Sequence, residues 1–255
     1  MNPTMPLISL RRLGKTYANG TTALDNIDLD VEAGALLTLL GPSGCGKSTI
    51  LRLIAGLEPP SRGTLLRDLP AGRRAIGFVF QDATLMPWAN VFDNVFLGLR
   101  LQGVSRPAAT PVVEEMLALV GLAHEAGRFP RELSGGMRMR VSIARALAMR
   151  PPILLMDEPF AALDEITRFK LNDDLLALQS ELKTTIVFVT HSVYESVYLS
   201  RRIAVMAARP GRIVKWIDLD ASLPRDKEFR VSQAYTQYCA EVSNALQEGQ
   251  NGNLI

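Results

Sequence analysis

The chain of 255 residues lacks any apolar run long enough to cross a membrane. Its longest runs, at residues 35–40, 153–156 and 186–189, have the length of strands, whereas a spanning helix needs roughly 20 residues. Residues 1–10 also lack the basic start and apolar stretch of a secretory signal. We therefore expect neither a spanning segment nor a cleaved leader.

Cysteine and net charge are scarce as well. The two cysteines, Cys45 and Cys239, supply neither a disulfide framework nor a zinc-binding spacing, which favours a reduced, cytosolic location. The net charge is only +2, which is too weak to indicate a nucleic-acid partner. Hydrophobic residues make up 47% of the chain and charged residues 21%, as in an ordinary globular protein that buries a core.

Short apolar runs alternate with amphipathic segments of helical length. The uninterrupted runs, typical of strands buried on both faces of a parallel sheet, are residues 36–40, 76–80, 153–156 and 185–190. The helical patterns cover residues 48–57, 136–149 and 166–182. This alternation predicts a three-layer α/β fold.

Three regions depart from that alternation. Residues 89–150 contain helical patterns and no clear strand, so we expect a helical insertion in the α/β core. Residues 8–31 alternate and contain Asn19 and Gly20, a strong tight-turn pair, so they are predicted to form a hairpin. Residues 221–255 are expected to form a C-terminal helix or tail with a frayed end.

The strongest motif is the segment Gly41-Pro42-Ser43-Gly44-Cys45-Gly46-Lys47-Ser48. It matches the pattern G-x-x-x-x-G-K-[ST], follows a predicted strand and opens a predicted helix, which is the context of a phosphate-binding P-loop. Its glycines let backbone N–H groups point inward at phosphate oxygens. We expect Lys47 to reach the β- and γ-phosphates and the Ser48 hydroxyl to ligate Mg²⁺.

Two adjacent acids, Asp157 and Glu158, end the apolar run at residues 153–156. Beside a P-loop, Asp157 is expected to serve Mg²⁺ and Glu158 to orient or deprotonate the attacking water. Taken alone, the pair is equally compatible with a solvated strand end.

A second helix start carries the residues Ser134, Gly135 and Gly136. Ser134 is a good N-cap, and the two glycines leave backbone N–H groups open, so this helix start is a second candidate anion site. A plain capped helix is the alternative.

With these motifs in this order, the chain resembles the ATP-binding cassette (ABC) family, the nucleotide-binding subunits of ABC transporters. The resemblance covers about residues 5–220. It implies one ATPase domain with a P-loop NTPase (RecA-like) core, an N-terminal antiparallel β subdomain and an α-helical subdomain inserted at about residues 89–150. The matching parts in chain order are the P-loop, the Q-loop glutamine Gln81, the signature at residues 133–137, the Walker B strand at residues 153–157, the adjacent Glu158, the D-loop ending at Asp164 and the switch histidine His191.

The resemblance implies ATP and Mg²⁺ as cofactors. Tyr17 matches the aromatic residue that stacks on adenine, although it could simply pack beside a turn. Gln81 is implied as a Mg²⁺ contact, with an ordinary polar residue as the alternative. His191 is implied as a catalytic contact to the γ-phosphate, against the alternative of a structural histidine. Thr49 completes the nucleotide-binding segment after Ser48.

The resemblance also implies an assembly. Ser134, Gly135 and Gly136 would serve the ATP bound to a second copy, so a head-to-tail homodimer would close on ATP and reopen after hydrolysis. Asp164 of the D-loop is implied as a further nucleotide-binding residue. Transmembrane permease subunits and, indirectly, a solute-binding protein are expected partners, with no nucleic acid. The expected location is peripheral, on the cytoplasmic face of the inner (plasma) membrane.

Two departures from the family pattern point to a branch. Met137 replaces the usual glutamine, and Ser192 replaces a frequent aspartate, but neither change removes a phosphate ligand. Met137 and the segments at residues 85–95 and 208–213 resemble importers for nitrate, sulfonates and taurine. A small organic or inorganic anion is therefore the expected solute.

Two features of the sequence each allow two interpretations. The apolar cluster near Gln81 either forms a groove for a helix of a membrane partner or packs the helical insertion onto the core, and we expect both in part. Its members are Phe80, Leu85, Met86, Trp88, Val91 and Phe92. Cys45 is either a tolerated small residue of the P-loop or a site where oxidation blocks ATP.

Two other functions compete with transport. A soluble ABC ATPase of DNA repair, ribosome or iron–sulfur assembly is the alternative, although the chain has neither a long coiled coil between its motifs nor a second cassette. A small-molecule P-loop kinase is disfavoured by Ser134–Gly136 and His191.

Overall fold

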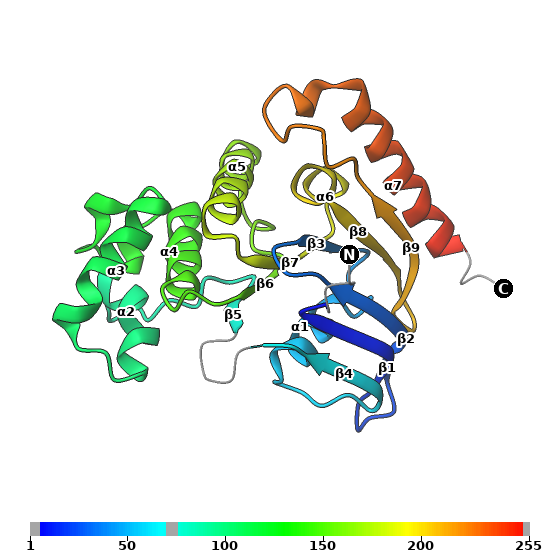
Figure 1. Cartoon of the computed structure of the whole chain (residues 1–255), viewed down its shortest axis with the longest axis horizontal. Coiled ribbons are helices and arrows are strands. Elements are labelled where there is room, and N and C mark those ends of the chain that lie inside the picture. The colour runs from blue at the N-terminus through cyan, green and yellow to red at the C-terminus, as the bar shows by residue number, and fades with distance from the viewer. Residues whose placement is uncertain (1–5, 70–75, 252–255) are drawn as a thin grey trace, which may run out of the picture. The chain divides into compact units, whose positions relative to one another are not determined.

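The computed structural model describes residues 6–69 and 76–251, which divide into two compact units (Figure 1). The first unit comprises residues 6–69 and 184–251, and the second comprises residues 76–183. Each unit has its own buried apolar residues. Some of the predicted nucleotide-binding motifs belong to the first unit and the others to the second.

A three-stranded antiparallel sheet opens the first unit. Its order is β2 (Thr22–Val31), β1 (Ile8–Thr16) and β4 (Arg62–Arg67). Thr16 pairs with Thr22 across a turn in which Gly20 donates its N–H to the carbonyl oxygen of Tyr17, so the predicted hairpin is confirmed. Strand β4 was not predicted because most of its residues are exposed and its sequence has no apolar run.

Four further strands of this unit lie in the order β7 (Thr185–Thr190), β3 (Leu36–Leu40), β8 (Arg202–Ala207) and β9 (Arg212–Asp218). The first three are parallel, and β9 is antiparallel to β8. Every residue of β3 and β7 is buried, which explains their uninterrupted apolar sequences. The strands predicted at residues 36–40 and 185–190 are therefore confirmed.

Three helices pack on these strands. Helix α1 (Lys47–Ala55) contacts β7, and α6 (Val193–Leu199) contacts β3 and β7. Helix α7 (Gln233–Asn251) contacts α6, β8, β9 and η3 (Phe229–Val231), and Figure 1 shows it running along β9. The frayed end expected for the tail falls partly on residues 252–255, outside the described residues. Among the helices described, none is both long and apolar enough to cross a membrane.

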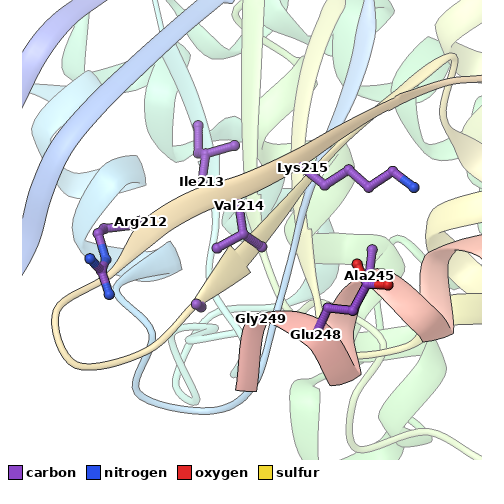
Figure 2. Close-up of a pocket in the computed structure, with 8 residues that line it drawn as sticks. Arg212, Ile213, Val214, Lys215, Ala245, Glu248 and Gly249 are labelled. Atoms are coloured by element: carbon purple, nitrogen blue, oxygen red, sulfur yellow. The ribbon is translucent and has the colours of Figure 1, made fainter. Parts of the chain in front are cut away.

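A pocket of about 430 Å³ lies where α7 meets β9 (Figure 2). Val214 and Lys215 line it from the strand, and Ala245, Glu248 and Gly249 line it from the helix. Lys215 forms an ion pair with Glu241 of α7 at 3.0 Å. None of the residues that line this pocket belongs to the predicted nucleotide site.

The second unit holds the parallel pair β5 (Ile76–Val79) and β6 (Ile153–Asp157). All the regular elements between these two strands are helical: α2 (Val91–Leu101), α3 (Arg106–Leu119), η1 (Ala123–Glu125), η2 (Pro130–Glu132) and α4 (Gly135–Leu147). Helix α5 (Glu165–Leu182) follows β6. The predicted helices at 136–149 and 166–182 thus match α4 and α5 within two residues at each end.

Asn94 of α2 holds the loop that precedes this helix. Its side chain is fully buried. The amide oxygen accepts from the Met86 N–H at 2.8 Å, and the amide nitrogen donates to the carbonyl oxygens of Met86, Ala89 and Asn90 at 3.0–3.2 Å. A single side chain therefore fixes both ends of the turn that carries Trp88, whose side chain is 78% exposed.

Replacing Asn94 by alanine is expected to lower the free energy of unfolding by about 2–3 kcal/mol, because several buried backbone groups lose their partner. Asn172 of α5 is the matched control: it is equally buried, but its amide oxygen accepts no hydrogen bond from the described residues. Asn172→Ala should cost less than about 1 kcal/mol. Urea unfolding of both variants measures the difference, and equal losses would contradict the role of Asn94.

Candidate nucleotide-binding site

The predicted P-loop connects β3 to α1 in the first unit. Gly46 is the residue before the helix and has a left-handed backbone with φ of 91°, which is strained for any residue with a side chain. No side chain of the described residues caps α1, and no acidic residue occupies its first turn. The first N–H groups of α1 are therefore not capped by a side chain, which suits an anion.

Lys47 folds back over this loop. Its ammonium donates to the carbonyl oxygen of Gly41 at 2.7 Å and to that of Pro42 at 3.0 Å. The side chain is only 4% exposed, and a buried ammonium must be hydrogen-bonded to offset the loss of water. The loop thus holds a positive charge beside its own N–H groups, as the sequence predicts for a phosphate site.

Cys45 is a residue of the same loop. The residue is fully buried, and its Sγ is 3.9 Å from the Lys47 ammonium. A buried thiol is shielded from oxidants and alkylating reagents. Of the two readings for Cys45, the structure therefore favours a small packing residue.

Tyr17 lies directly after β1 and reaches the start of α1. Its hydroxyl is 3.3 Å from the hydroxyl of Thr49, and the ammonium of Lys15 lies 5.3 Å from its ring centroid. The side chain is half-buried. The hairpin therefore brings the predicted adenine-stacking residue to the helix that begins at the P-loop.

His191 lies at the same end of the strands as the P-loop. Leu40 of β3 is in parallel register with Thr190 of β7, and Gly41 and His191 are the next residues of each chain segment. The carboxyl ends of parallel strands meet at one edge, which is where ligands bind in α/β folds. His191 is exposed at this edge.

The unusual Ser192 caps the helix after His191. Its hydroxyl accepts from the Glu195 N–H at 3.3 Å, and its own N–H donates to the Thr190 hydroxyl at 3.0 Å. Serine and aspartate are both strong N-caps, so this departure from the family pattern keeps the helix start intact.

Asp157 is the last residue of β6, Glu158 follows it, and Gln81 lies just after β5. Val79 is in register with Met156, so Gln81 and Glu158 each lie two residues beyond a paired position. Glu158 has a left-handed backbone, with φ of 46°. Such strain in a residue with a long side chain is maintained by its surroundings and is concentrated at functional sites.

The signature and the D-loop lie together in the second unit. Ser134 caps α4 by accepting from the Met137 N–H at 3.2 Å. A Cβ on Gly135 would lie 3.5 Å from Leu163, and one on Gly136 would lie 2.7 Å from Thr167. The predicted second anion site therefore packs closely against the start of α5.

Asp164 caps α5 in the same way. Its carboxylate accepts from the Thr167 N–H at 2.9 Å, and this hydrogen bond lowers the pKa of Asp164 below its usual value. The sequence analysis assigned Asp164 only to nucleotide binding and missed this capping role.

The structure thus gathers the predicted residues into three sets. Tyr17, the P-loop and His191 belong to the first unit. In the second unit, Gln81 lies near Asp157 and Glu158, and the signature lies near Asp164. Among the described residues, no group of three or more His, Cys, Asp or Glu side chains could hold a metal by itself.

The predicted apolar cluster splits as expected between packing and exposure. Val91 and Phe92 are buried at the start of α2, and Leu85 and Met86 are half-buried. Trp88 and Phe80 remain exposed, at 78% and 40%. Part of the cluster is thus buried and part is exposed, while packing of the insertion onto the core and docking of a partner helix both stay predictions.

Arg145 of α4 is a residue that the sequence analysis missed. Its guanidinium donates to the carbonyl oxygens of Ala83 and Thr84 at 2.9 Å, which ties the segment after Gln81 to the helix of the signature. Burial lowers its pKa below the usual value for arginine. A charged residue inside the apolar stretch at residues 141–147 was the signal that could have identified it.

Comparisons with known proteins show the family of the chain. Residues 24–161, more than half of the chain, match the ABC transporter family. The chain is 46% identical over 209 residues to the taurine import ATP-binding protein of Rhizobium johnstonii, covering 80% of this chain and 79% of that protein. It is 43% identical over 236 residues to the aliphatic sulfonates import ATP-binding protein of Bacillus licheniformis, covering 90% and 91%.

A solved structure is similar to this chain and belongs to the same kind of ATP-binding protein. The dimeric post-hydrolysis state of an ATP-binding cassette bound to ADP and Pi matches with a TM-score of 0.73 at 34% identity, over 84% of this chain and 99% of that one. The α/β fold, with its P-loop NTPase core, antiparallel β subdomain and inserted helices, is the fold of such cassettes. The chain belongs to the ABC transporter family and is an ATP-binding, ATP-hydrolysing protein of that family.

Proposed function

We propose that this chain is the energy-coupling subunit of an importer for a small anion such as a sulfonate or a nitrate-like solute. The proposed ATPase activity rests on the register of Leu40 with Thr190, which puts the P-loop and His191 at one edge of a sheet. The import part rests on the relatives named for taurine and aliphatic sulfonates.

The P-loop would hold the phosphates of ATP. Backbone N–H groups of the loop at residues 41–46, in which Pro42 alone has none to give, and of Lys47, Ser48 and Thr49 would surround the phosphate oxygens at the start of α1. Lys47 exchanges the carbonyl oxygens of Gly41 and Pro42 for the β- and γ-phosphates. Tyr17 offers its ring face to adenine.

The donors assigned to Mg²⁺ suit that ion. The Ser48 hydroxyl, the Gln81 amide oxygen and the Asp157 carboxylate are hard oxygen ligands, and Mg²⁺ in phosphate sites takes only a few protein ligands beside phosphate oxygens. When bound, Mg²⁺ neutralises charge that develops on the phosphates.

Hydrolysis would use Glu158 and His191. Glu158 accepts the proton of the attacking water or orients that water, and its left-handed backbone is of the kind found at functional sites. His191 contacts the γ-phosphate and holds the attack geometry. Ser192 sets the path of the chain after His191 by capping α6.

Two copies of the chain would share two ATP molecules. Ser134, Gly135, Gly136 and Asp164 lie close together at the starts of α4 and α5, where Ser134, Gly135 and Asp164 are exposed and Gly136 is buried. These helix starts would bind the ATP held by the P-loop of the other copy. ATP then closes a head-to-tail homodimer, and hydrolysis reopens it. The dimeric cassette with ADP and Pi supports this arrangement.

The partners that cross the membrane would be separate permease subunits. Two aromatic residues of the predicted cluster are exposed: Trp88, in the turn held by Asn94, and Phe80, which precedes Gln81 in the sequence. The ring centroids of Phe80 and Phe78 lie 4.3 Å apart. An amphipathic helix of a permease fits such a surface. The chain would then lie on the cytoplasmic face of the membrane, with a solute-binding protein acting indirectly and no nucleic acid involved.

Glu158→Gln should keep ATP binding but slow phosphate release at least about 100-fold, because the amide cannot accept the proton. The unhydrolysed ATP should trap a dimer on size-exclusion chromatography. Glu181→Gln, an exposed glutamate at the end of α5, is the control and should hydrolyse ATP normally. Normal turnover by Glu158→Gln would remove this residue as the base.

Trp88→Ser should lower the membrane-bound fraction of the chain at least fivefold in cells that make the whole transport system. Leu101→Ser is the control, since Leu101 is also an exposed apolar residue of the second unit, at 71%. Sedimentation of membranes followed by immunoblotting measures both. A wild-type chain that stays with DNA, ribosomes or iron–sulfur proteins instead would favour the soluble alternative.

A further inference from the structure

Gly211 connects the antiparallel sheet to the strands of the P-loop. It lies in the turn between β8 and β9, next to Arg212, which Figure 2 shows where the chain enters β9. Its N–H donates to the carbonyl oxygen of Ala23 at 3.0 Å, and its carbonyl oxygen accepts from the Asp25 N–H at 2.9 Å. This bridge is isolated from the regular ladders of both sheets.

The same residue presses against the P-loop. A Cβ on Gly211 would fall closer to the carbonyl oxygen of Cys45 than real Cβ atoms approach, and 2.8 Å from the carbonyl oxygen of Ala23. Both obstacles are backbone atoms, so no side chain can rotate to make room. Gly211 is therefore required by close approach, and the backbone of Cys45 rests directly on it.

Gly46, the next P-loop residue, packs against Leu24 and Ala23, which belong to the same bridge. A Cβ on Gly46 would lie 2.5 Å from the Cδ2 atom of Leu24 and 3.0 Å from the Ala23 carbonyl oxygen. Leu24 is fully buried. Cys45 and Gly46 thus pack closely against three residues: Ala23, Leu24 and Gly211.

We propose that Gly211 is a positioning residue for ATP, because it sets the path of the P-loop at Cys45 and Gly46 and hence the direction of its N–H groups. The inference rests on the proposed binding of ATP phosphates by this loop. The bridge also ties the hairpin that carries Tyr17 to the loop, so one contact links the adenine side of the site to the phosphate side. A displacement of the order of 1 Å at such a site is enough to lower the catalysed rate about 100-fold.

Gly211→Ala tests the proposal. We expect the Kd for ATP to rise at least fivefold, measured by calorimetric titration well below the melting temperature of the variant. Hydrogen–deuterium exchange should increase in the peptide that contains residues 41–48. Gly127→Ala is the control, because a Cβ on the exposed Gly127 meets nothing within 4 Å, and it should leave both quantities unchanged.

A role in folding alone would give a different result. It would lower the melting temperature of Gly211→Ala but leave the Kd of the folded protein at the wild-type value, and that result would overturn the proposal. If wild-type protein itself bound no ATP, the proposed function would fail instead.

A second pair of variants covers the case in which Gly211→Ala does not fold. Leu24→Ala removes the side chain beneath Gly46 and should raise the Kd for ATP at least threefold, whereas Leu24→Met conserves volume and should restore it. Equal wild-type affinity in both Leu24 variants would also overturn the proposal.

Discussion

A loop can present its backbone N–H groups to a phosphate only if its other side is held by the rest of the fold. In this chain, that constraint governs the first unit. The loop of residues 41–46 leaves a fully buried strand, curls over the Lys47 ammonium and rests on Ala23, Leu24 and Gly211. The antiparallel sheet and the β8–β9 turn are far apart in sequence, yet both pack against this loop and hold its path.

The second unit obeys a related rule, since each of its candidate functional segments begins at a helix start or a strand end. Ser134 and Asp164 satisfy the first N–H groups of α4 and α5, and their helix starts contact each other. Arg145 then ties α4 to the segment after Gln81. Ser134 and Asp164 are thus helix caps as well as proposed binding residues, so a change at either would affect both stability and the proposed site.

Much of this could be predicted from the sequence, because local rules determine it. The P-loop, the buried strands and the Asn19-Gly20 turn follow from spacing, apolar runs and turn propensity. Strand β4 could not be predicted, because its residues are exposed and have no periodic apolar pattern. Gly211 and Arg145 were not identified for another reason: their contacts join segments more than 60 residues apart. The charge of Arg145 inside an apolar stretch marks the residue as unusual, but the sequence does not show which segment it contacts.

The proposed function depends most on ATP binding by the P-loop through its backbone N–H groups and Lys47. Calorimetric titration of Lys47→Ala with ATP tests this binding most directly, beside Lys227→Ala, which removes an exposed lysine of the first unit. We expect Lys47→Ala to lose measurable binding and Lys227→Ala to bind like wild type. Unchanged affinity in Lys47→Ala would contradict binding of ATP by the P-loop.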